Sequence, residues 1–110
     1  MAEAPNRRKS PRVSVAETLD AEYANSFAIE LLDLSASGAR FRAPRDIPVN
    51  SALRITINFY PVEFPIRGLV AWSRKVDEET YEHGCEFVNL DPEEQYLIKN
   101  YVNEVLREQK

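Results

Sequence analysis

A run of strict two-residue alternation at residues 53–60 constrains the fold of this chain more than any other segment. Its apolar members are Leu53, Ile55, Ile57 and Phe59, and its polar or hydroxylated members are Arg54, Thr56, Asn58 and Tyr60. Because side chains two apart on a strand share a face, this pattern predicts a β-strand with one buried face. Weaker versions of the pattern recur along the chain, so the fold class is predicted to be mainly β.

Five further strands are predicted from apolar residues at the same spacing. They cover residues 13–23, 27–35, 39–43, 64–72 and 81–87. Gly38 precedes the third of these strands and is expected to turn the backbone with a positive φ, so that the second and third form a hairpin. Six strands with short links predict a barrel or a sandwich.

The strand at residues 27–35 carries two polar side chains close to its end. The two-residue period places Leu32 and Leu34 on one face, and Asp33 and Ser35 on the opposite, outer face. Asp and Ser before a glycine often bond to the backbone of their own turn. Alternatively, a carboxylate and a hydroxyl on one face can contact a base edge or a phosphate of a ligand. The residue pattern alone leaves these two interpretations balanced.

A helix is predicted at about residues 91–108, at the end of the sequence. Asp91 can cap it, Pro92 suits the first helical position, and Glu94 completes a capping box. The apolar stripe that follows consists of Leu97, Ile98, Tyr101, Val102, Val105 and Leu106. This spacing predicts that the helix lies against the sheet, with the possibility that it covers one open end of a barrel.

Composition is that of a single soluble domain. The 110 residues are 44% hydrophobic and 29% charged, and they contain no long apolar run that predicts a membrane span. The first ten residues lack the apolar core of a signal peptide, so a cytoplasmic location is expected. Cys85 is the single cysteine, which excludes an internal disulfide and agrees with this expectation.

Charge is distributed unevenly along the chain. The net charge is −4, but residues 1–12 carry four cations against one carboxylate, so the remainder carries −7. A general nucleic-acid binder spreads cations over a face, whereas this distribution suits local capture of a small anion. Residues 76–94 contain no Lys or Arg, and their acidic side chains are expected to form a solvated face that could also repel nucleotides or dock a basic partner.

The basic segment is predicted to be a flexible N-terminal arm at residues 1–12, preceding a folded domain at 13–110. Pro5 and Pro11 flank Arg7 and Arg8, and Pro11 precedes Arg12 directly, so a helix is disfavoured there. Its cations, Arg7, Arg8, Lys9 and Arg12, fit a solvated tail that aids solubility. They also fit a ligand clamp, because a guanidinium can pair with guanine O6 and N7, bind phosphate bidentately and stack on a purine.

Two motifs in this order resemble those of the PilZ domain family, bacterial receptors for cyclic di-GMP. They are Arg8-Lys9-Ser10-Pro11-Arg12 and Asp33-Leu34-Ser35-Ala36-Ser37-Gly38. Two further segments extend the similarity to nearly the whole chain, namely Gly68-Leu69-Val70-Ala71-Trp72 and His83-Gly84-Cys85-Glu86-Phe87. The resemblance implies a six-stranded antiparallel β-barrel with a C-terminal helix, and cyclic di-GMP as ligand.

The resemblance also implies a role for each motif residue. Arg8 and Arg12 would grip guanine edges and phosphates, Asp33 and Ser35 would contact a guanine, and Gly38 would permit the tight turn. Arg7 directly precedes the first motif and resembles members that bind two stacked cyclic di-GMP molecules. Candidates of a second tier are Ser37, Arg40 and Trp72. Ser37 stands where a glycine is often found, Arg40 otherwise fits a solvated position, and Trp72 has the parity of a core residue.

Catalysis has little support in the sequence. No glycine-rich phosphate loop or nucleophile motif is present, and His83 with Cys85 does not make a zinc site. His83 is predicted to be a structural strand residue, and no metal, cofactor or enzyme activity is expected.

The predicted function is a cyclic di-GMP receptor that orders its arm on binding and signals to a downstream protein, in motility or biofilm regulation. Neither nucleic-acid binding nor membrane insertion is expected. The alternatives are a PilZ-like adaptor that binds protein alone, and a small-barrel binder of single-stranded nucleic acid. Outward aromatics on a basic groove would favour the last of these, and the acidic body argues against it.

Overall fold

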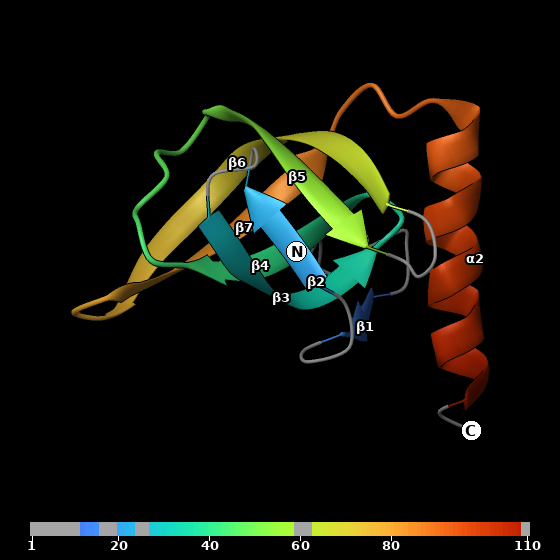
Figure 1. Cartoon of the computed structure of the whole chain (residues 1–110), viewed down its shortest axis with the longest axis horizontal. Helices are drawn as coiled ribbons and strands as arrows, with labels where there is room; N and C mark the ends of the chain where they lie inside the picture. The colour runs from blue at the N-terminus through green and yellow to red at the C-terminus, as the bar shows by residue number, and fades with distance from the viewer. Residues whose placement is uncertain (1–11, 16–19, 24–26, 59–62, 109–110) are drawn as a thin grey trace, which may run out of the picture.

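The computed structural model describes residues 12–15, 20–23, 27–58 and 63–108, and these form strands and one helix (Figure 1). In chain order they are β1 Arg12–Ser14, β2 Asp20–Tyr23, β3 Phe27–Ser35, β4 Gly38–Ala43, β5 Ala52–Asn58, β6 Glu63–Asp77, β7 Thr80–Phe87 and α2 Pro92–Glu108. Neighbouring strands are antiparallel throughout. The prediction of a mainly β fold with a helix after the last strand is confirmed.

Strands β2 to β7 close into a six-stranded barrel. Each pairs with two neighbours in the order β3, β2, β5, β6, β7, β4, and β4 pairs again with β3. The barrel alternative is therefore the one realised. The single strand predicted at residues 13–23 is wrong, because β1 and β2 pair with opposite ends of β3: Val13 lies opposite Leu34, whereas Ala21 lies opposite Ile29.

The core fills the inside of this barrel. Its fully buried members include Leu31, Leu34, Phe41, Ile55 and Ile57. The alternation that predicted β5 is observed, since its odd-numbered residues from Leu53 to Ile57 are buried; Phe59 lies outside the described residues. Burial of each such side chain stabilises the fold by about 1.5–3 kcal/mol.

Helix α2 lies beside β1 and β3 at one end of the barrel (Figure 1). The predicted capping box is present: Glu94 N–H donates to Asp91 Oδ1 (2.9 Å), and Asp91 N–H donates to Glu94 Oε1 (3.1 Å). Ile98 and Val102 are the buried residues of its apolar stripe. Within the described residues, no helix combines the length and the apolar character that crossing a membrane requires.

At two β-bulges, side chains point to a different face of the sheet from the one that the two-residue period predicted. In β3 the register shifts between Leu31 and Asp33, and in β6 it shifts between Val70 and Trp72. Each bulge inserts one residue, so the face of the sheet that later residues occupy is reversed. The core interpretation of Trp72 is therefore wrong, because its side chain is 40% exposed while Val70 is buried.

The first bulge likewise corrects the assignment of Leu32. Leu31 and Leu34 are the fully buried pair, whereas Leu32 is only half-buried. A two-residue period would have grouped Leu32 with Leu34. The bulge keeps Leu34 in the core and leaves Asp33 on the side of the sheet that faces a pocket.

Candidate functional site

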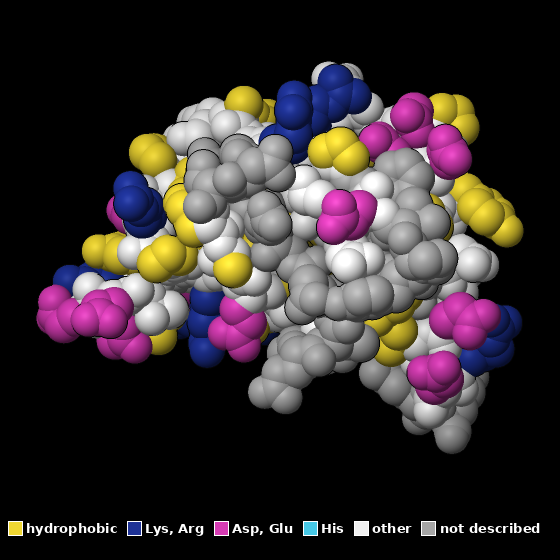
Figure 2. Space-filling model, viewed as in Figure 1, with side chains coloured by type: hydrophobic (Ala, Val, Ile, Leu, Met, Phe, Trp, Pro, Cys, Tyr) yellow, Lys and Arg dark blue, Asp and Glu magenta, His cyan; other side chains and the backbone are white. Residues whose placement is uncertain are grey.

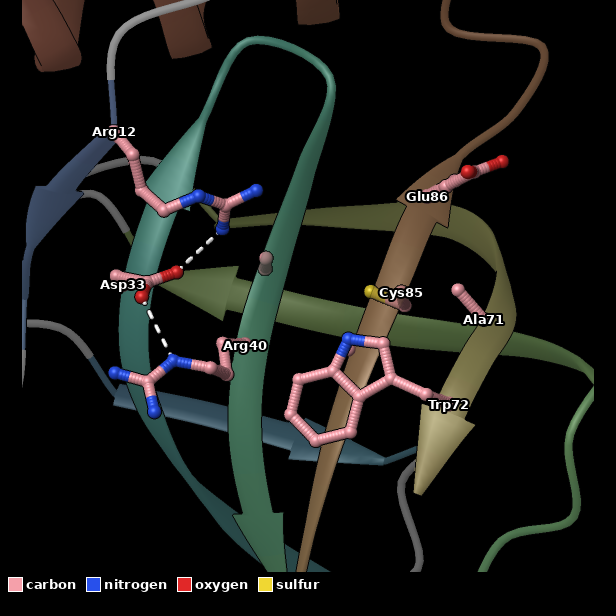
Figure 3. Close-up of a pocket in the computed structure, with 9 residues that line it drawn as sticks. Arg12, Asp33, Arg40, Ala71, Trp72, Cys85 and Glu86 are labelled. Atoms are coloured by element: carbon pink, nitrogen blue, oxygen red, sulfur yellow. Dashed lines mark hydrogen bonds and ion pairs between the residues drawn. The ribbon is translucent and has the colours of Figure 1, made fainter. Parts of the chain in front are cut away.

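A pocket of about 300 Å³ lies where β3, β4, β7 and β6 run next to one another (Figure 3). Its charged and aromatic lining residues are Arg12, Asp33, Arg40, Trp72 and Glu86. The volume lies at the lower end of the range of about 300–1,000 Å³ that is usual for small-molecule sites. Asp33 and Trp72 directly follow the two bulges described above, so these two bulges lie on opposite sides of the pocket.

Asp33 is held between two guanidinium groups (Figure 3). Arg12 Nη1 donates to Asp33 Oδ1 at 2.5 Å, and Arg40 Nε donates to Asp33 Oδ2 at 2.9 Å. Only 8% of the aspartate is exposed. A carboxylate at this depth needs charged partners, and two charge-assisted hydrogen bonds from different strands fix its orientation.

Arg40 forms a second ion pair on its other side. Its Nη1 donates to Glu82 Oε2 at 2.9 Å. The hydrogen bond to Asp33 and the charges of both carboxylates raise the pKa of Arg40 above its ordinary value, against a smaller opposing effect of burial. Arg40 is partly solvated, with its side chain 40% exposed, but its guanidinium also bridges two carboxylates, which the sequence did not predict.

Trp72 borders the pocket opposite these charges (Figure 3). Its indole lies over Gly84, where a Cβ atom would overlap the indole nitrogen. Glycine at position 84 therefore makes room for the ring. An aromatic face beside hydrogen-bonding groups is suited to stacking on a flat heterocycle.

Ser35 takes part in the β3–β4 turn. Gly38 N–H and Ser37 N–H each donate to Ser35 Oγ at 3.2 Å, and Ser37 Oγ lies 3.3 Å from the same oxygen. No register shift separates Asp33 from Ser35, so the two share the outer face of β3 as predicted, but Ser35 is only 1% exposed. The turn-cap interpretation describes Ser35, whereas Asp33 faces the pocket.

Gly38 is required for a different reason from the one expected. No described glycine has a positive φ, so the predicted left-handed conformation is wrong. A Cβ atom at Gly38 would instead overlap the backbone carbonyl oxygen of Cys85 on the neighbouring strand β7. The glycine allows β4 and β7 to approach closely.

The structure therefore brings four of the predicted site residues to one pocket: Arg12, Asp33, Arg40 and Trp72. Ser35, Ser37 and Gly38 form the adjacent turn. Arg7 and Arg8 lie outside the described residues. The predicted boundary after residue 12 stays a prediction, although Arg12 itself opens β1 opposite Ser35.

Sequence reasoning missed Glu82. The acidic side chains of residues 76–94 were expected to be solvated, and those at the tip of the β6–β7 hairpin are exposed (Figure 2). Glu82 is 1% exposed, because Arg40, Arg42 and Arg74 surround its carboxylate. Burial of Glu82 could have been predicted only from the pairing of β7 with β4 and β6, because both of these strands carry arginines opposite it. That pairing cannot be known without the strand register.

The prediction that His83 is structural is confirmed. The residue is fully buried, Ile47 N–H donates to its Nε2 at 3.0 Å, and the centroid of its ring lies 5.0 Å from that of Phe41, on which it stacks.

Burial raises the pKa of the Cys85 thiol to about 12, so this cysteine is neutral at physiological pH. Within the described segments, no three residues of metal-binding type cluster.

Several solved structures have the same fold as this chain. The inhibitor of motility MotI/DgrA from Bacillus subtilis matches with a TM-score of 0.80 at 14% identity, covering 94% of this chain and 53% of that protein. YcgR from Escherichia coli in complex with cyclic di-GMP matches with a TM-score of 0.75 at 16% identity, covering 94% and 47%. This chain thus spans about half the length of each.

A third structure corresponds to the chain over nearly its whole length. The PilZ domain of Escherichia coli YcgR with cyclic di-GMP matches with a TM-score of 0.70 at 18% identity, covering 94% of both chains. No curated protein sequence matches. The family model of the PilZ domain matches residues 6–104, which together with the barrel, the capped helix and the two motifs establishes that the chain belongs to the PilZ domain family.

Proposed function

We propose that this chain is a receptor that binds cyclic di-GMP in the pocket between Asp33 and Trp72. The observation that carries the proposal is the carboxylate of Asp33, fixed by Arg12 and Arg40 and facing an aromatic ring within one pocket. Two of the similar structures, both PilZ proteins or domains, contain cyclic di-GMP. These structures support the choice of ligand.

Recognition of guanine is assigned to Asp33. Guanine offers an N–H and an amino group side by side, and a carboxylate accepts both. The bonds from Arg12 and Arg40 take one position on each oxygen, and each oxygen retains further acceptor capacity. Trp72 supplies the stacking surface for the base, which its half-exposed ring and the space above Gly84 support.

The phosphates are assigned to the arginines of the first motif. Arg12 already borders the pocket, and Arg8 lies four residues before it, within about 14 Å along an extended chain. A guanidinium binds phosphate bidentately, so Arg8 folding onto the ligand would add a directional contact. Arg7 next to it would hold a second, stacked ligand molecule.

Ser35 and Gly38 act through the shape of the site in this proposal. The hydroxyl of Ser35 is bonded to the turn, and Gly38 sets the approach of β4 to β7, so both support the position of Asp33 and Arg40. Ligand binding then draws residues 7–11 onto the barrel and creates a new surface. A downstream protein reads this surface, and no chemical step is catalysed.

The test is a titration with cyclic di-GMP by calorimetry and by the fluorescence of Trp72, the single tryptophan of the chain. One bidentate arginine contact contributes about 1–3 kcal/mol, so Arg8→Ala should weaken binding about 10- to 100-fold. The control is Arg107→Ala, which removes an exposed cation paired with Glu104 on α2. It should leave the affinity unchanged.

Each alternative result has a definite meaning. Unchanged affinity in Arg8→Ala would refute the role of the arm. No binding of wild type at high micromolar ligand would refute the receptor proposal and favour the adaptor that binds protein alone. About two ligands per chain would support the role given to Arg7, and a one-to-one stoichiometry would contradict it.

A further inference from the structure

Glu82 is a buried carboxylate outside the pocket lining. It lies on β7 between β4 and β6, and both neighbouring strands direct arginines at it. Arg40 Nη1 is 2.9 Å from Oε2, Arg42 Nε is 3.9 Å from the same oxygen, and Arg74 bonds to Oε1. Three cations thus converge on one side chain that the proposed ligand site does not include.

The strand register arranges these charges in two parallel rows across β3, β4, β7 and β6. One row, the site row, consists of Asp33, Arg40, Gly84 and Trp72. The next row, the charged row, consists of Glu30, Arg42, Glu82 and Arg74. Arg40 links the rows, since its Nε bonds to Asp33 and its Nη1 bonds to Glu82.

Burial makes the position of Glu82 rigid. An ionised carboxylate that is almost fully buried must stay paired, because leaving its charge uncompensated is strongly unfavourable. The side chain of Arg40 is 40% exposed, and a long exposed side chain would otherwise sample several rotamers. Bonds at two of its nitrogens, to carboxylates on different strands, hold the guanidinium in one orientation.

We propose that Glu82 is a positioning residue for the ligand site, and that it acts through Arg40. Glu82 anchors Arg40, Arg40 orients Asp33, and Arg40 itself lines the pocket. Arg74 and Arg42 cover Glu82 and balance its charge. This inference rests on the proposed function, because its consequence is the affinity for cyclic di-GMP.

A double-mutant cycle on ligand affinity tests whether Glu82 acts on the site through Arg40. Glu82→Gln keeps the shape and removes the charge, and it should weaken cyclic di-GMP binding about fivefold or more. Arg40→Ala should weaken binding at least as much. In the Arg40→Ala background, Glu82→Gln should have less than about a twofold further effect. Additive effects of the two changes would overturn the inference, because a merely structural glutamate would weaken binding independently of Arg40.

The matched control is Glu104→Gln, the same chemical change at an exposed, ion-paired carboxylate on α2. It should bind like wild type. If wild type binds and Glu82→Gln binds equally well, the inference is wrong while the proposed function stands. If wild type does not bind, the proposed function fails, and the inference fails with it.

Arg40→Lys provides a second variant in case Glu82→Gln does not fold. A lysine keeps the positive charge, but its single ammonium cannot bond to Asp33 and Glu82 in the forked geometry of arginine. Binding should again fall about fivefold or more, with the circular dichroism spectrum of the folded barrel retained. Wild-type affinity in Arg40→Lys would overturn the inference.

Discussion

Strands β4 and β7 bury their two faces by opposite means. On the inner face Phe41 is fully buried and stacks on His83. On the outer face Glu82 is buried almost as completely, but its neighbours are Arg40 and Arg74. The same pair of strands therefore carries an apolar surface and an ion-pair network back to back.

The two faces therefore have different roles, with the inner face governing the stability of the fold and the outer face governing the geometry of the ligand site. Apolar burial is non-directional, so the inner face supplies most of the stabilising free energy without fixing any one side-chain orientation. Ion pairs with hydrogen-bond geometry contribute less net stability but are directional. We therefore expect changes on the inner face to lower stability and changes on the outer face to alter the ligand site.

Phe41→Ala should have the largest effect on stability. Truncating a fully buried phenylalanine removes apolar burial and leaves a cavity, which costs about 3–5 kcal/mol. Urea unfolding followed by circular dichroism measures this loss. The fraction that remains folded should bind cyclic di-GMP with an affinity within about twofold of wild type. A large loss of affinity with little loss of stability would contradict the separation of the two faces.

Local patterns predicted the inner face and the helix well. The alternation of Leu53, Ile55 and Ile57 and the capping box of Asp91 with Glu94 depend on residues close in sequence. The bulges that keep both Leu31 and Leu34 in the core and turn Trp72 toward the pocket depend on partner strands, so no local pattern specifies them.

Burial of Glu82 is non-local in the same way. It depends on the register of three strands, and an acidic run in the sequence gives no sign of the arginines opposite it. The motifs placed Arg12 and Asp33 correctly in one pocket, but only the folded turn, with its bonds to Ser35 Oγ, decides between the two interpretations of Ser35.

Gly38→Ala should have the second-largest effect. The added methyl group would overlap the carbonyl oxygen of Cys85, and a backbone carbonyl within a paired strand cannot move without disturbing the ladder. Overpacking of this kind costs about 1–3 kcal/mol. Thermal unfolding measures the loss, and Ala39→Gly, at the next position, is a control for changes between glycine and alanine on β4. Wild-type stability in Gly38→Ala would show that β4 and β7 can separate freely.

Gly84→Ala should cost less stability and affect the outer face instead. Its methyl group would overlap the indole of Trp72, which is half-exposed and can turn away from the barrel. We expect a stability loss below about 1 kcal/mol, a shifted emission maximum of Trp72, and weaker cyclic di-GMP binding from lost stacking. An unchanged emission spectrum would contradict the position of the ring over Gly84.

The pH dependence of stability should show the smallest effect, and it reports on the inner face. Burial lowers the pKa of His83 below its ordinary value of 6.5, although Asp46 at 3.9 Å opposes this shift. As the pH falls through 6.5, the unfolded chain takes up a proton that the folded chain resists, so stability falls.

His83 is the single histidine of the chain, so its contribution can be isolated. Between pH 7 and pH 6 the loss from one such group is at most about 0.7 kcal/mol. His83→Gln, which can still accept the hydrogen bond from Ile47 N–H, should remove this dependence while lowering stability at both pH values. Urea unfolding at the two pH values measures the difference. If wild type gained stability at pH 6, His83 would have to be charged in the folded state, and the inner face of β7 would then hold an ion pair like the outer one.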